Sequence, residues 1–184
     1  MSVEIIIHSI YNFTVKRIFL KIFIILLLPS YSFACALLNV PIGSSIPSVV
    51  GTFEFLDGHD TQYKGSGRSF RYIEPAMDYC EGASLENADL EIIIYDHKIA
   101  SISLFSTDTE SQNEIYEFAK VRISDPGEEV KKKNWTGFKN LSVGSLLIFY
   151  SKIEERGEIG EILKITNSEM LDYTIDEQIV DANG

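Results

Sequence analysis

The stretch Ala88-Asp-Leu-Glu-Ile-Ile-Ile-Tyr-Asp-His-Lys-Ile-Ala-Ser-Ile-Ser-Leu-Phe-Ser106 decides the fold. Two runs rich in Ile, Leu and aromatic residues, Ala88–Tyr95 and Lys98–Ser106, are separated only by Asp96-His97. A two-residue connection between β-type runs predicts a hairpin, and Asp tolerates the positive φ that its turn requires. The three consecutive isoleucines at 92–94 indicate burial on both faces of this ribbon. We therefore expect the hairpin at the centre of a sheet.

Shorter β-type runs lie on either side of this hairpin. Upstream, Val49–Leu56 and Arg68–Ile73 alternate apolar and polar side chains, which is typical of strands with one buried face. Downstream, Ser145–Lys152 and Glu158–Thr166 predict a second hairpin, with its turn around Glu155–Gly157. No strand–helix–strand alternation connects the runs, so we expect an antiparallel sheet of about six strands.

One amphipathic helix is expected between the two hairpins. Four apolar residues at helical spacing form its buried stripe: Ile115, Phe118, Ala119 and Ile123. Thr107–Thr109 offers capping oxygens, and the helix ends at Pro126 because Pro cannot continue it. The charged segment 128–140 is expected to be mobile, and 167–180 is expected to hold a short helix capped by Ser168. The predicted class is α+β, with the helix packed on one face of the sheet.

An export signal precedes this domain. Cations from Lys16 onward lead into an apolar run that ends at Leu28, and the small residue Ala34 stands before Cys35. This layout predicts cleavage between Ala34 and Cys35. The apolar run is shorter than the roughly 20 residues of a membrane-spanning helix, so we expect no stable membrane insertion after cleavage. A signal retained as an anchor is the alternative.

Three segments follow from this interpretation. Residues 1–14 are a start-site extension, residues 15–34 are the signal peptide, and residues 35–184 form one globular α+β domain with an acidic C-terminal tail. The expected location is the periplasm of a bacterium or the medium outside it.

The charge of the chain restricts its partners. Loss of residues 1–34 removes Lys16, Arg17, Lys21 and Glu4, which moves the formal net charge from −11 to −13. Such a chain would be repelled by nucleic acid and by anionic membranes. It favours a basic protein partner, unless the charge serves solubility alone.

Two cysteines remain in the exported chain, Cys35 and Cys80. An even number of cysteines in an oxidising compartment predicts one disulfide between them. The alternative is a catalytic thiol at Cys80 with His59 or His97 as its base, and the presence of Cys35 disfavours it.

The loop Asp57-Gly58-His59-Asp60 is the most reactive cluster in the sequence. Two carboxylates and an imidazole could ligate a metal or act as acid and base, although Asp and Gly are also common turn residues. No nucleophile elbow, phosphate-binding loop or Cys-x-x-Cys pair is present, so we expect no catalytic residue, no metal and no cofactor. The residues that could contact a partner are Asp57, His59, Asp60, Trp135, Glu154, Glu155 and Glu158.

These observations predict an exported, non-catalytic binding protein. In its sharper form, the prediction is an inhibitor or immunity protein that protects against a basic hydrolytic toxin or cell-wall enzyme. Surface carboxylates would steer such a protein onto a cationic active-site cleft. One alternative is an envelope assembly or structural factor. A second is a small hydrolase or metal-dependent enzyme that uses the 57–60 loop.

Overall fold

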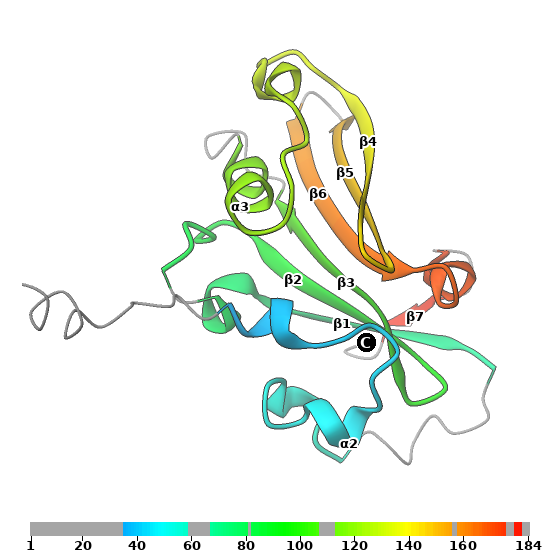
Figure 1. Ribbon diagram of the computed structural model, residues 1–184. Coiled ribbons are helices and arrows are strands. Elements are labelled where there is room, and N and C mark those ends of the chain that lie inside the picture. Colours follow the sequence, from blue (N-terminus) through cyan, green and yellow to red (C-terminus); the bar gives the residue numbers. More distant parts are fainter. Residues whose placement is uncertain are drawn as a thin grey trace, which may run out of the picture. The chain divides into compact units, whose positions relative to one another are not determined.

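The structure is a computed structural model that describes residues 35–58, 67–80, 82–106, 113–155, 158–175 and 179–181 (Figure 1). The predicted start-site extension, signal peptide and capping residues at 107–109 lie outside these ranges, as do His59 and Asp60. All of the described residues belong to one compact unit of the chain.

The described residues form an α+β structure around a seven-stranded sheet with the strand order β4-β5-β6-β3-β2-β1-β7 (Figure 1). Six strands pair in antiparallel fashion, as predicted, and the seventh, β7, joins β1 in parallel. The strands are β1 (Ser69–Pro75), β2 (Asp89–Tyr95), β3 (Lys98–Ser106), β4 (Gly137–Val143), β5 (Leu146–Glu155), β6 (Glu158–Asn167) and β7 (Ile179–Asp181).

The central hairpin β2–β3 confirms the prediction from the opening stretch. Asp96 and His97 both have positive φ, 45° and 64°, as the mirror-image turn of a two-residue hairpin requires. Ile92, Ile93 and Ile94 are all 0% exposed, so the strand is buried on both faces. The backbone N–H of Ile46 donates to the His97 carbonyl at 2.9 Å, which joins the N-terminal segment to this turn.

The second hairpin, β5–β6, also confirms its prediction, but β4 corrects one. Residues 128–140 were expected to be a mobile charged segment. They instead form the 3₁₀ turn η4 (Glu128–Lys131) and the first half of β4. Gly144 at φ 60° turns β4 into β5, so Gly137–Val143 pairs with β5 along its full length.

The helix α3 (Glu114–Arg122) is the one helix of seven or more residues in the described part of the chain. It buries Ile115, Tyr116, Phe118 and Ala119 and contacts β3 and β6, so it lies on one face of the sheet (Figure 1). The 3₁₀ turn η3 (Ala76–Tyr79) lies between β1 and β2.

The strand predicted at Val49–Leu56 is wrong. This region contains α2 (Ile46–Val49) and the 3₁₀ turn η2 (Glu54–Leu56), preceded by a third short turn, η1 (Ala36–Asn39). The spacing of the buried residues explains the difference. Ile46, Val49, Phe53 and Leu56 are buried at intervals of three and four, which suits helical turns and not the period of two of a strand.

The C-terminal segment contains a 3₁₀ turn, η5 (Leu171–Thr174), where a short helix was expected. Ser168 does not cap it. The side chain of Asn167 instead accepts hydrogen bonds from the N–H groups of Glu169 and Met170. The Tyr173 ring stacks on Tyr95 with centroids 3.6 Å apart, so this segment packs against the central hairpin.

Candidate functional site

The two faces of the sheet differ in what covers them. The core face carries the main apolar cluster and is covered by α3 and the N-terminal segment. Cross-strand neighbours in an antiparallel sheet share a face, so the register defines the residues of the other side, here called the open face. From β2 to β4, the open face carries Glu91, Ser103, Phe105, Ile162, Lys164, Phe149, Ser151, Ile153 and Phe138.

The structure confirms the predicted disulfide between Cys35 and Cys80. Both residues are buried, and they also form an isolated antiparallel bridge. The disulfide fixes the start of the described chain beside η3. No thiol is left free among the described residues.

The predicted partner-binding residues fall into three separate places. Asp57 is exposed directly after η2, and its predicted companions in the 57–60 loop lie outside the described residues. Trp135 is half buried and stacks on Tyr150 with centroids 6.3 Å apart. Glu154 and Glu158 are exposed at the end of the β5–β6 hairpin, and Glu155 is the last residue of β5. The η2 segment and the β5–β6 ribbon lie well apart in Figure 1.

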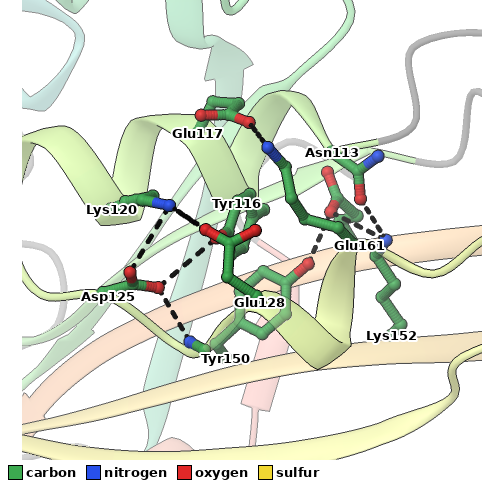
Figure 2. A network of polar contacts seen from close by, with 11 residues as sticks. Asn113, Tyr116, Glu117, Lys120, Asp125, Glu128, Tyr150, Lys152 and Glu161 are labelled. Carbon is green, nitrogen blue, oxygen red and sulfur yellow. Dashed lines mark hydrogen bonds and ion pairs between the residues drawn. The ribbon is translucent and has the colours of Figure 1, made fainter.

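A buried ion pair, absent from the predictions, lies beneath α3 (Figure 2). Lys152 of β5 and Glu161 of β6 lie 3.6 Å apart, and their side chains are only 1% and 4% exposed. Glu161 also accepts hydrogen bonds from the Tyr150 hydroxyl at 2.5 Å and from the backbone N–H of Ile115 at 3.0 Å. Lys152 donates to the side-chain oxygen of Asn113 at 2.5 Å. The carboxylate therefore binds the first turn of α3 to the sheet.

A second group of charges closes the other end of α3 (Figure 2). Lys120 pairs with Glu128 and, at 3.5 Å, with Asp125. Its ammonium also donates to the Tyr116 hydroxyl at 3.2 Å. The backbone N–H of Gly127 donates to Asp125 at 2.8 Å. These contacts join the helix to the chain that follows it.

The protonation states fit these contacts. Burial and the adjacent charge of Glu161 raise the pKa of Tyr150, so its hydroxyl keeps its proton and acts as a donor. The hydrogen bond to Glu128 raises the pKa of Lys120. The Gly127 N–H lowers the pKa of Asp125, and Lys120 adds to this effect. Tyr150 is therefore neutral, Lys120 positively charged and Asp125 negatively charged in these contacts.

An open groove of about 790 Å³ runs along α3, between the helix and the loop 82–87. Glu114 lies in its wall. Burial raises the pKa of Glu114, while the N–H groups of Asn87 and Glu86 partly offset this. The groove mixes both signs of charge, with Glu86, Glu117, Arg122 and Lys131 among its lining residues. The charges that line the groove therefore do not favour anionic ligands over cationic ones, or the reverse.

The side chains described above do not form a metal-binding site among the described residues. No group of three or more His, Cys, Asp or Glu side chains among them could hold a metal ion. Because Lys152 and Glu161 are buried against each other, neither presents a free group to a substrate. The network of hydrogen bonds and ion pairs links α3 to the β5–β6 hairpin and stabilises the fold.

The exposed apolar residues of the β4–β5–β6 ribbon form the more accessible feature. Phe138 is 72% exposed and Ile153 is 51% exposed. Phe138 pairs with Ser151, two residues from Ile153 on the same strand, so both side chains lie on the open face. At the end of the same hairpin, Glu158 lies on the open face and Glu154 on the opposite face, because side chains alternate along a strand. We call Phe138, Ile153, Glu154 and Glu158 the ribbon-tip patch.

Glu154 and Glu158 of this patch are among the residues predicted from the sequence as partner contacts, whereas Phe138 and Ile153 are not. Phe138 was hidden because residues 128–140 were interpreted as one charged segment. The alternation of polar Asn140 and Ser142 with apolar Leu141 and Val143, followed by the turn residue Gly144, is the signal that could have revealed the strand.

No family model, curated protein or solved structure matches this chain. None of the helices in the described part of the chain has the length and apolar content that a membrane crossing requires.

Proposed function

We propose that the protein is an exported, non-catalytic binding protein that docks a basic protein on the ribbon-tip patch. In its sharper form, it inhibits a basic hydrolytic toxin or cell-wall enzyme. The observation that carries the proposal is the exposure of Phe138 and Ile153 on one face of one ribbon. Large apolar side chains gathered at an exposed site and rimmed by polar groups are typical of interaction surfaces.

The charge of the tip supports a basic partner. The sequence Ile153-Glu-Glu-Arg-Gly-Glu158 contains three Glu and one Arg. Lys139, the cation within β4, is already paired with Glu129 at 2.5 Å. The full chain carries a formal net charge of −11, so long-range attraction would also favour a cationic partner. Lys132 and Lys133 are exposed just before β4 and provide the opposing charge for a test.

Export agrees with the disulfide. The predicted signal peptide at 15–34 would deliver the chain to an oxidising compartment, where disulfides form and persist. The pairing of Cys35 with Cys80 is the state expected there. Cleavage before Cys35 and a periplasmic or secreted location are parts of this proposal.

Capture of a partner from envelope extract tests the proposal. At low salt, the exported protein should retain a basic protein, and the double variant Phe138→Ser/Ile153→Ser should lose it. Val121→Ser is the matched control, because Val121 is 73% exposed on α3, outside the patch. The charge reversal Glu154→Lys/Glu158→Lys should weaken capture, whereas Lys132→Glu/Lys133→Glu should not. Equal capture by the patch variant and the control would show that the patch is not the docking site.

A further inference from the structure

The strand β4 forms one edge of the described sheet. It stands at the end of the strand order and pairs only with β5 among the described residues. Its seven residues follow a continuous register from Gly137 opposite Lys152 to Val143 opposite Leu146. Figure 1 shows β4 on the outer side of the ribbon. The outer backbone groups of a strand in this position can accept another strand.

The hairpin geometry identifies those backbone groups. Gly144 at φ 60° is the first central residue of the turn between Val143 and Leu146, which fits a two-residue hairpin turn closed by a hydrogen-bonded pair. Antiparallel pairs then alternate between hydrogen-bonded and non-hydrogen-bonded residues. The N–H and C=O groups of Phe138, Asn140 and Ser142 consequently face away from β5.

The two edges of the described sheet differ in how well they are protected. At the far edge, β7 is only three residues long, and short edge strands resist further pairing. The strand β4 is longer, contains no Pro and has no register shift against β5. Its one charged residue, Lys139, is neutralised by Glu129. Of the usual devices that block strand addition, β4 therefore carries only the paired Lys139.

From these observations, we propose that the docked protein adds an extended, basic segment to β4 as a further strand. This inference rests on the proposed function and specifies how the partner is recognised. Backbone hydrogen bonds to Phe138, Asn140 and Ser142 would supply affinity, and alternate apolar side chains would pack on Phe138. The carboxylates Glu154 and Glu158 lie on the β5–β6 hairpin beyond Gly137, so an added segment that runs past the start of β4 would bring its cations toward them. A second copy of this chain is the poorer occupant, because each copy carries a net charge of −11.

The test uses a fluorescein-labelled eight-residue peptide of alternating Val and Lys, added to the exported protein. Asn140→Pro removes one outward N–H and leaves the pairing with β5 in place, because Pro is tolerated on the solvent side of an edge strand. It should weaken peptide binding at least tenfold. Asn140→Ala, the matched control, keeps the N–H and should change binding less than twofold. Fluorescence anisotropy measures both, and thermal unfolding checks that each variant is folded.

Amide hydrogen exchange on the unmodified protein tests the same contacts without a substitution. Addition of the Val–Lys peptide should slow exchange at Phe138, Asn140 and Ser142 at least tenfold and leave Leu141 nearly unchanged. Unchanged exchange at all three sites would overturn the inference. Equal binding of a Val–Glu peptide would overturn the preference for a basic segment. Protection that grows with protein concentration before any peptide is added would assign the edge to a second copy.

These outcomes separate the inference from the proposed function. If Phe138→Ser/Ile153→Ser abolishes capture of a basic protein from envelope extract while Asn140→Pro does not, the patch binds by side chains alone. The strand addition would then be wrong and the binding function would stand. If neither variant changes capture, both proposals are wrong.

Discussion

The hairpins β2–β3 and β4–β5 both have two-residue turns, but they differ in how much of their surface is buried. In β2, three consecutive isoleucines are 0% exposed, because Met170 and Tyr173 of the C-terminal segment also cover the open face around Ile93. In the β4–β5 ribbon, Tyr150 is fully buried on the core face, whereas Phe138 and Ile153 remain exposed on the open face. Strand sequences of similar apolar content therefore have different roles, and the difference depends on what packs against them. A strand buried on both sides contributes to the core with both faces, and one covered on a single side leaves its other face exposed to solvent.

The largest expected effect lies on the core face of the ribbon. Replacement of Glu161 by Leu leaves Lys152 buried without its counter-ion, which costs about 3–5 kcal/mol for a buried pair. The Tyr150 hydroxyl and the Ile115 N–H also lose their acceptor. Urea unfolding monitored by tryptophan fluorescence measures the change. The control Glu158→Leu, at the exposed end of the same strand, should stay within about 0.5 kcal/mol. Similar losses of unfolding free energy for both variants would show that the buried pair Lys152–Glu161 does not stabilise the fold.

A pair of truncations tests the contrast between the hairpins directly. Ile92→Ala removes fully buried methyl groups and should destabilise by about 2–5 kcal/mol. Phe138→Ala removes a larger side chain that is 72% exposed and should change stability by less than about 0.5 kcal/mol. The same urea experiment measures both. A loss above about 2 kcal/mol for Phe138→Ala would show that this ring is part of the core.

The turn of the β4–β5 ribbon gives a smaller effect. Gly144 has φ 60° and open space around its missing side chain, so Gly144→Ala should cost about 1–2 kcal/mol through backbone strain alone. Gly51→Ala is the matched control, because Gly51 also has open space but no positive φ. It should change stability by less than about 0.5 kcal/mol in thermal unfolding. Equal changes for the two variants would contradict the turn geometry.

The smallest effect concerns acid stability at the end of α3. The pKa of Asp125 is lowered by the Gly127 N–H and by Lys120, so the charged form is favoured in the folded state. The stability from this carboxylate is present above its ordinary pKa and is lost as pH falls through the lowered folded value. Asp125→Asn should therefore show a smaller fall of Tm than the unmodified protein between about pH 5 and pH 3. Asp57→Asn, an exposed carboxylate on another element, should behave like the unmodified protein.

Local sequence patterns were sufficient for the central part of the fold. The isoleucine run and the two polar turn residues predicted β2–β3, because both signals act within a few residues. The N-terminal strand was wrong because Val49, Phe53 and Leu56 suit more than one period over so short a window. The parallel strand β7 was missed because its pairing with β1 joins residues more than 100 positions apart.

The candidate site was predicted only in its charged half. Sequence reasoning selects Glu154 and Glu158 because adjacent carboxylates stand out, but exposure of Phe138 depends on which elements cover the open face. The buried pair Lys152–Glu161 was missed for a related reason. A charged residue is expected on the surface unless a residue of opposite charge is known to lie beside it. Lys152 and Glu161 become neighbours only in the β5–β6 register, which the sequence does not show.

The disulfide also has a mechanical consequence. Tension applied at Cys35, as in a single-molecule pulling experiment, passes through the sulfur atoms to Cys80. The backbone of residues 36–79, including α2 and β1, carries none of that load. Forced unfolding from the N-terminal side would therefore begin after Cys80. The first strand to bear the force is β2, whose three isoleucines are fully buried.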